Sequence, residues 1–302
     1  MSFKLTILGS GAAVPTLNRS VTSQYLNFNE RRILIDCGEG TQMQLRKFRV
    51  KFQRLQFLLI SHLHGDHYLG IFGLLASMNL TGRTSKLTIV SPPGLKELVE
   101  LQFKTSKVYL AYEIEFITIE SKTKELVFED KVLKIFAFPM KHRVPTYGYS
   151  FEEQSKRPNV DKEMIKEYAL TTLEIQQALR GENIEKDGEI ISPNQVLLPP
   201  AKPLKFVHCS DSLYKEALVE WISDADLLYH EATFLEKEKD RAKATMHSTA
   251  ADAAKIAQKS KAKKLLIGHF SARYKNTDKL LEEAQEIFPN VVCVEDGDEY
   301  LI

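Results

Sequence analysis

Histidine and aspartate residues concentrate in one short segment of the chain, His-Leu-His-Gly-Asp-His at 62–67. It follows an apolar run that predicts a buried strand and precedes a segment with helical periodicity. In an extended chain, His62, His64 and Asp66 would point to one side, whereas His67 would turn away where the helix begins. The segment could therefore supply two neighbouring metal ions. Imidazole and carboxylate ligands suit zinc, manganese or iron.

Three further candidate ligands lie far away in the sequence. Two metal ions that share a bridging ligand need about seven protein ligands, so the segment alone is not enough. His142, Asp211 and His269 each come just after a predicted strand, which is where open α/β sheets collect their binding sites. Each of the three could be structural when taken alone. Their shared position favours one common site.

The elements that must position these residues alternate between two kinds. Short apolar runs rich in β-branched and aromatic residues predict strands over 5–8, 33–35, 57–60, 87–90, 114–119, 132–138, 206–207, 227–229, 265–267 and 291–294. Apolar residues with a period near 3.6 predict helices over 71–80, 95–103, 213–222, 248–259 and 278–288. Strands and helices that alternate in this way indicate an α/β fold.

One polar stretch, from about residue 152 to residue 200, breaks this alternation. Two short helices are expected inside it, over 162–168 and 173–179, and a proline cluster around Pro199 follows them. Such a stretch is typical of an insertion rather than of a sheet core. We therefore expect residues 1–302 to form a single domain that carries an inserted arm at 152–200.

Composition restricts the class of protein further. The 302 residues include 41 Lys and Arg against 40 Asp and Glu, so the whole-molecule charge gives no argument for nucleic acid, and any such surface must be local. The 43% apolar and 27% charged fractions exclude a disordered, collagenous or coiled-coil chain. The three cysteines are far apart and form no CxxC pair. The apolar run among the first residues is too short for a signal peptide or a membrane span. These features favour a cytoplasmic protein without a membrane partner.

Beyond its metal-ligand spacing, the sequence resembles the metallo-β-lactamase superfamily and, within it, the ribonuclease Z family of tRNA 3′-processing endoribonucleases. The resemblance covers nearly the whole chain. The histidine-rich segment marks the superfamily, whereas the opening loop and His230–Thr233 followed by His247 mark the ribonuclease. The further matching motifs are Leu8–Thr16, Asp36–Gln42, Lys141–Pro145, Asp211, His247-Ser248 and Gly268–Tyr274. The resemblance implies a four-layer αββα sandwich with a protruding inserted arm.

The resemblance also implies a division of the candidate ligands between two Zn²⁺ ions per chain, with Mn²⁺ or Fe²⁺ as alternatives. One ion would be held by His62, His64 and His142, the other by Asp66, His67 and His269, with Asp211 as the bridge. Two zinc ions with two aspartates and a bridging hydroxide leave a net positive site, which favours attack of that hydroxide on a phosphodiester. Asp66 would accept a proton from the nucleophile. The products would be a tRNA with a 3′ hydroxyl and a trailer with a 5′ phosphate.

Two residues are expected to act beside the metals. By the same resemblance, Glu231 fixes the imidazole of His247 and favours its charged form. An imidazolium there would stabilise the transition state and protonate the leaving 3′ oxygen. Without the resemblance, His247 could equally be a residue at the start of a helix. His230 is expected to be packed or to support the ligands, and the residues give no role to His208.

Local basic groups must hold the RNA, because the chain as a whole is neutral. The candidate contacts are Arg46, Lys47, Arg49, Lys156, Arg157 and Arg273. In the family the arm clamps the tRNA elbow and is basic, but residues 152–189 here hold six Lys or Arg against ten Asp or Glu. We therefore expect weaker or differently placed elbow binding. The resemblance further implies a homodimer in which the arm of one subunit faces the site of the other.

Two other functions compete with a ribonuclease that removes the 3′ trailer of precursor tRNA. A hydrolase of small phosphodiesters or sulfate esters would keep the metals but would need neither the arm nor the pair of Glu231 and His247. A non-catalytic RNA-binding scaffold would tolerate loss of ligands. The seven intact candidate ligands argue against the scaffold.

Overall fold

The computed structural model describes residues 3–155 and 158–302, and the chain divides into two units. The main unit comprises Met1–Glu152 and Lys205–Ile302, and the arm unit comprises Glu153–Leu204. The arm unit overlaps the stretch 152–200 that the sequence marks as an insertion. Within the described ranges, no helix is both long enough and apolar enough to cross a bilayer.

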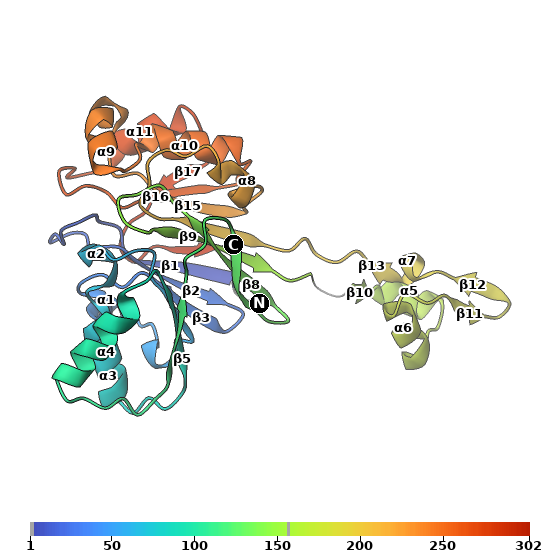
Figure 1. Ribbon diagram of the computed structural model, residues 1–302. Helices are drawn as coiled ribbons and strands as arrows, with labels where there is room; N and C mark the ends of the chain where they lie inside the picture. Colours follow the sequence, from blue (N-terminus) through green and yellow to red (C-terminus); the bar gives the residue numbers. More distant parts are fainter. Residues whose placement is uncertain (1–2, 156–157) are drawn as a thin grey trace. The chain divides into compact units, whose positions relative to one another are not determined.

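The first sheet of the main unit has seven strands in the order β18-β1-β2-β3-β4-β5-β6 (Figure 1). Its strands are β1 (Phe3–Gly9), β2 (Ser23–Phe28), β3 (Arg31–Ile35), β4 (Phe57–Leu59), β5 (Leu87–Ser91), β6 (Ile114–Thr118) and β18 (Glu299–Leu301). Strands β3 to β6 run parallel to one another. Buried residues of these strands pack against the helices α1 (Thr41–Lys47), α3 (Ile71–Leu80) and α4 (Leu95–Thr105). A short 3-10 turn, η1 (Phe52–Arg54), precedes β4.

The second sheet also has seven strands, in the order β17-β16-β15-β14-β9-β8-β7. Its strands are β7 (Glu125–Glu129), β8 (Leu133–Pro139), β9 (Tyr147–Glu153), β14 (Lys205–Cys209), β15 (Leu227–Glu231), β16 (Leu265–Gly268) and β17 (Val291–Cys293). Its outer face is covered by α8 (Leu218–Ile222), α10 (Ala250–Lys259) and α11 (Asp278–Gln285). A 3-10 turn, η2 (Glu236–Glu238), leads into α9 (Lys239–Thr245).

The two sheets face each other, with helices on the outside of each, which confirms the expected four-layer α/β sandwich. A hydrogen bond joins the two sheets next to the histidine segment: the Tyr149 hydroxyl on β9 donates to the Ile60 carbonyl at 2.7 Å. The backbone N–H of Tyr147 donates to the Ser61 carbonyl at 3.0 Å in the same region. The segment after β4 is therefore fixed to both sheets.

Several strands were not apparent from the apolar pattern. Strand β2 contains Ser23, Gln24 and Asn27, and β9 contains Gly148 and Ser150, so neither reads as an apolar run. Both strands are nonetheless largely buried, because each lies inside a sheet whose neighbours supply its hydrogen bonds. The expected helix over 213–222 is also too long, since α8 begins at Leu218.

The arm unit has a small core of its own, made by Leu170, Ala178, Ile184, Ile191 and Val196. Its helices α5 (Lys162–Glu167) and α6 (Thr172–Leu179) confirm the two short helices expected there, and each begins after a side-chain cap. The unit also contains α7 (Pro193–Val196), a pairing of β10 (Asn159–Val160) with β13 (Leu197–Leu198), and a hairpin of β11 (Ile184–Lys186) and β12 (Glu189–Ile191). Asp187 and Gly188 both have positive φ at the hairpin turn, as its tight two-residue loop requires.

Candidate metal centre

The local backbone divides the histidine segment at Gly65. Strand β4 ends at Leu59, and His64 is still extended, with φ of −84° and ψ of 146°. The short helix α2 (Gly65–Tyr68) then carries Asp66 and His67 in its first turn. The expectation that Asp66 shares one side with His62 and His64 is therefore wrong, because the extended backbone ends at His64 and Asp66 lies in the helix that begins at Gly65.

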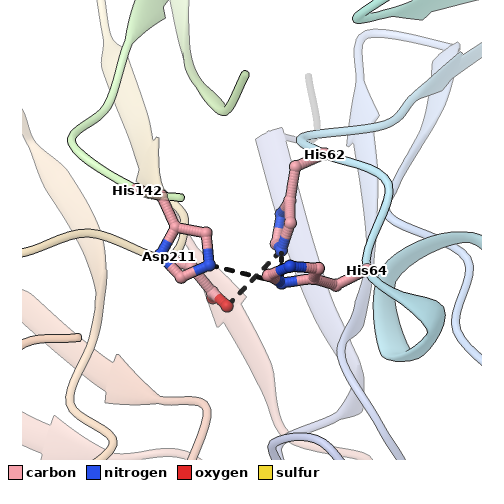
Figure 2. Close-up of side chains that lie close together, drawn as sticks. All are labelled: His62, His64, His142 and Asp211. Carbon is pink, nitrogen blue, oxygen red and sulfur yellow. Dashed lines mark hydrogen bonds and ion pairs between the residues drawn. The ribbon is translucent and has the colours of Figure 1, made fainter. Parts of the chain in front are cut away.

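The first group of donor atoms brings together residues from three separate chain segments (Figure 2). It consists of His62, His64, His142 and Asp211, whose donor atoms all lie within 4.8 Å of one another. The Nδ1 atom of His64 lies 3.0 Å from Nε2 of His62 and 3.3 Å from Nε2 of His142. Two ligands of a tetrahedral zinc ion with bonds of about 2.0–2.1 Å are separated by about 3.3 Å. These spacings therefore fit a shared cation.

The second group consists of Asp66, His67 and His269. The Nε2 atoms of His67 and His269 lie 3.2 Å apart, and each lies 3.5 Å from Oδ2 of Asp66. His269 follows β16 with a φ of +60°, a left-handed conformation that turns the chain directly after the strand. The grouping is the same as the division of ligands that the resemblance implies, and the role of these residues as metal ligands stays a prediction.

Asp211 lies between the two groups. Its Oδ2 atom is 3.6 Å from Nε2 of His62 and 3.4 Å from Nε2 of His67, and its Oδ1 atom is 3.2 Å from Nε2 of His269. Asp211 is buried, and its Oδ1 atom has no hydrogen-bond donor among the residues that the structure describes. A buried carboxylate oxygen without a donor is costly, so this atom fits a cation better than it fits a protein-only site.

The protonation states of the histidines also affect whether the two groups can bind metal ions. Burial lowers the pKa of His62 well below its usual value, and the neighbouring His67 lowers it further, so His62 offers the neutral ring that a metal needs. Burial also lowers the pKa of His67, but the charges of Asp211 and Asp36 outweigh it and raise that pKa. A cation in the second group must therefore displace a proton from His67.

Hydrogen bonds from outside the two groups orient the ligand rings. Asp36 Oδ2 lies 2.8 Å from Nδ1 of His67, and Asp36 in turn accepts hydrogen bonds from the backbone N–H and hydroxyl of Ser61. His142 Nδ1 lies 2.8 Å from the Met246 carbonyl, and His269 Nδ1 lies 2.9 Å from the Thr233 hydroxyl. Such contacts fix the ring orientation and tune the ligands.

Sequence reasoning missed these supporting residues. Asp36 and Thr233 belong to motifs that carry the family resemblance, and nothing in the sequence distinguishes Ser61. The one usable signal was the position of Asp36 directly after a predicted strand, the same position that marked His142, Asp211 and His269.

Glu231 and His247 meet beside the second group. Nδ1 of His247 lies 3.1 Å from Oε1 of Glu231 and 3.8 Å from Oδ2 of Asp211. Burial lowers the pKa of His247, but the charges of Glu231 and Asp211 outweigh it and raise the pKa to about 9. His247 is therefore an imidazolium near neutral pH. A third donor group, made by Asp211, His247 and His269, would alternatively make His247 a ligand.

Glu231 itself is held by a dense set of donors. Its Oε1 atom accepts hydrogen bonds from the backbone N–H groups of Ser212 and Ser248, at 3.1 and 2.8 Å. Its Oε2 atom accepts from the backbone N–H and the hydroxyl of Thr233, at 3.0 and 2.8 Å. Burial raises the pKa of Glu231, but the charge of His247 and its hydrogen bond outweigh this, and the pKa is lowered. The carboxylate is thus fixed in its charged form.

A cavity of about 320 Å³ opens onto both donor groups. Its lining includes His64, Asp66, Asp211, His247 and His269. Arg273, an expected RNA contact, also lines it, and its guanidinium lies 5.1 Å from the centre of the Phe234 ring. The cavity thus brings donors from both groups together with the imidazolium of His247 and with the guanidinium of Arg273, which is ion-paired with Glu238.

The other expected RNA contacts lie elsewhere. Arg46 and Lys47 are exposed at the end of α1, and Arg49 is exposed just beyond it; they do not line the cavity. Lys156 and Arg157 fall outside the described residues.

The two remaining histidines are buried and belong to neither donor group. The ring of His208 stacks on Tyr229 with centroids 5.0 Å apart, and Nδ1 of His230 lies 2.7 Å from the Glu231 carbonyl. His230 therefore contacts the strand end that carries Glu231, as expected of a packed or supporting residue.

Comparisons with known sequences and structures identify relatives of this chain. Residues 3–154 match the family model described as Anti-Pycsar protein Apyc1. A protein of Bacteroides fragilis (strain YCH46) named Ribonuclease Z is 41% identical over 296 residues, which cover 98% of this chain and 97% of that protein. The crystal structure of human tRNase Z, short form, has a TM-score of 0.71 and 27% identity, and the match covers 98% of each chain. The metallo-beta-lactamase fold protein YhfI from Bacillus subtilis matches in fold, with a TM-score of 0.71, 19% identity and full coverage of both chains.

Proposed function

Because the chain belongs to the ribonuclease Z family and is a tRNA 3′-processing endoribonuclease, we propose that it cleaves precursor tRNA at the two donor groups that share Asp211. The observation that carries this proposal is their convergence beside the pair of Glu231 and His247, around one cavity. The seven proposed ligands include the whole set expected from the sequence.

Two zinc ions fit these groups, and Mn²⁺ and Fe²⁺ prefer similar ligands. Zinc would be held by His62, His64 and His142 in one group and by Asp66, His67 and His269 in the other, with Asp211 shared. When bound, the metals would supply an activated water and positive charge against the phosphate oxygens.

The chain's own residues would then handle the protons. Asp66 is 11% exposed at its side chain and lines the cavity, so it can accept a proton from the attacking water. A backbone N–H from Ala13 donates to Asp66 Oδ2 at 2.7 Å and holds the carboxylate in place. His247 would donate a proton to the leaving 3′ oxygen of the tRNA. Its Nδ1 atom faces Glu231, so Nε2 is the nitrogen that can meet the substrate.

The protein should contain close to two transition-metal ions per chain when purified without chelators. Elemental analysis measures this directly. Removing the metals with EDTA should lower the melting temperature, because the buried carboxylate of Asp211 then loses its counter-charge and because metals stabilise only the folded state. A content of one metal or none in active enzyme would contradict the two-group mechanism.

The cleavage chemistry can be tested by mapping the cut in a 3′-extended precursor tRNA. We expect a single cut after the discriminator nucleotide, with a 3′ hydroxyl on the tRNA and a 5′ phosphate on the trailer. The end groups are read by ligation and phosphatase treatment of the products. A 2′,3′-cyclic phosphate on the tRNA would mean that the RNA hydroxyl, rather than water, attacks the phosphate.

We also propose that the arm unit contacts the tRNA, that the enzyme is a homodimer, and that it works in the cytoplasm, where precursor tRNA would reach it. Support for the arm comes from its separate hydrophobic core, because a unit that packs on its own residues can keep its outer side chains free to contact RNA. Its acidic composition predicts weak phosphate binding on average.

Replacing four exposed acidic residues of the arm by glutamine should therefore tighten precursor binding. Suitable positions are Glu163, Glu167, Glu185 and Glu189. Each change removes repulsion of phosphate, and together they should lower KM severalfold at low salt, with kcat unchanged. Sedimentation or light scattering of the same samples reports the oligomeric state. An unchanged KM would mean that the arm does not approach the RNA.

A further inference from the structure

A second cavity, of about 410 Å³, is also lined in part by His247. Its lining contains four lysines and one carboxylate, and none of the seven proposed metal ligands: the residues are Lys141, Leu213, Tyr214, Lys239, Ala242, Lys243, His247, Asp252 and Lys255. His247 is the residue that this cavity shares with the cavity over the donor groups. We call it the lysine cavity.

Two of its lysines carry charge that no neighbouring carboxylate balances. Lys239 pairs with Glu236, and Lys255 lies 4.0 Å from Asp252. Lys141 and Lys243 are exposed and have no ion pair within the described part of the chain. Two unbalanced ammonium groups in a concave site attract an anion with several oxygens, such as a phosphodiester.

The lysine cavity is rigidly connected to the reaction centre. The backbone N–H of Lys141 donates to the Ser212 hydroxyl at 3.0 Å, and the next residue is the proposed ligand His142. Lys243 lies on α9, where the Ala242 carbonyl accepts a hydrogen bond from the backbone N–H of His247 at 2.8 Å. An anion that Lys141 and Lys243 hold would therefore sit at a defined position relative to His247.

The chemistry decides which part of the RNA enters the lysine cavity. In an in-line displacement, the leaving oxygen lies opposite the attacking water. The leaving oxygen belongs to the tRNA, so the acid that protonates it stands on the tRNA side of the cut. His247 is that acid in the proposed function, on which this inference rests.

We propose that the lysine cavity binds backbone phosphates of the nucleotides on the 5′ side of the cut, which form the 3′ end of the mature tRNA, and that Lys141 and Lys243 contact them. The trailer would leave by another route. Lys239 and Lys255 add positive potential but are partly neutralised by their own partners.

The test compares the double variant Lys141→Gln/Lys243→Gln with the control Lys104→Gln/Lys279→Gln, which removes the same charge from exposed positions on α4 and α11. Dissociation constants are measured between 50 and 200 mM salt for mature tRNA and for a 5′-phosphorylated trailer oligonucleotide. Neither probe is turned over.

We expect the double variant to bind mature tRNA roughly 20-fold more weakly, with a salt slope smaller by about one to two, because each lysine releases about one counterion. Trailer binding and both control measurements should not change. A loss confined to the trailer, or a loss no larger than in the control, would overturn the proposal. Lys243→Gln alone provides the same comparison without a change next to His142.

The same measurements distinguish failure of the proposed function from failure of the cavity assignment. If wild-type protein binds mature tRNA through these lysines but does not cut precursor tRNA, the cavity assignment stands and the catalytic proposal is wrong. If precursor is cut normally by the double variant and mature tRNA binds with full affinity, the catalytic proposal stands and the cavity assignment is wrong.

Discussion

Asp66→Ala is expected to abolish cleavage of a 3′-extended precursor tRNA while the protein still binds the RNA. The change removes one of three donors in the second group and the carboxylate proposed to accept a proton from the attacking water. Loss of a metal ligand and of a proton acceptor together should lower kcat by about 10³-fold or more. Binding should persist, because the basic residues proposed to hold the RNA lie outside the second donor group and are unchanged.

The matched control is Asp240→Ala, which removes an exposed carboxylate from the first turn of α9. It should retain the wild-type rate. Single-turnover cleavage and equilibrium binding are measured on both variants, together with metal content. Turnover by Asp66→Ala at a substantial fraction of the wild-type rate would show that neither proposed role of this carboxylate is needed.

Spacing and strand position predicted all seven proposed ligands, because both are properties of the local sequence. His142, Asp211 and His269 each follow a strand of the second sheet, at the end where β14, β15 and β16 run parallel. The carboxyl ends of such strands gather on one side, so residues distant in sequence meet. Their role as ligands stays a prediction, but their convergence follows from the topology.

The supporting residues could not be predicted in the same way. Asp36 reaches His67 because β3 lies beside β4 in parallel register, with Ile35 opposite Leu59. Nothing in the sequence around Asp36 specifies that pairing. Thr233 bonds Glu231 locally, but it reaches His269 only because β15 and β16 are neighbours. A single polar residue shows no periodicity in the sequence. Its role can be recognised only when it is known which strands the fold brings together.

The division of the histidine segment shows a second limit. Its alternating pattern favoured an extended chain through Asp66, but the structure begins a helix at Gly65. The backbone N–H of His67 donates to the His64 carbonyl at 2.9 Å, and the backbone N–H of Cys37 donates to the His67 carbonyl at 2.7 Å. A local bond and a tertiary contact thus accompany the change from extended chain to helix, and the tertiary contact is not visible in the pattern of the segment itself.

His247→Ala is expected to lower the rate of precursor cleavage by about 10²–10⁴-fold, the usual contribution of a positioned general acid, with metal content unchanged. The proposed ligands keep their other contacts, since His142 is held by the Met246 carbonyl and His269 by the Thr233 hydroxyl. Loss of metal would instead assign His247 to the third donor group, as a ligand with Asp211 and His269.

The decisive comparison for His247 uses a substrate whose leaving group needs no proton. Bis(p-nitrophenyl) phosphate expels a stable phenolate, so an enzyme without its acid should hydrolyse this diester almost as fast as wild type, within about tenfold. Precursor tRNA expels a strongly basic 3′ alkoxide and should show the full loss. Glu231→Gln should fall between wild type and His247→Ala on precursor tRNA, because it weakens the charge that keeps His247 protonated but leaves the ring in place. Equal losses on both substrates would mean that His247 stabilises the phosphate rather than protonating the leaving oxygen.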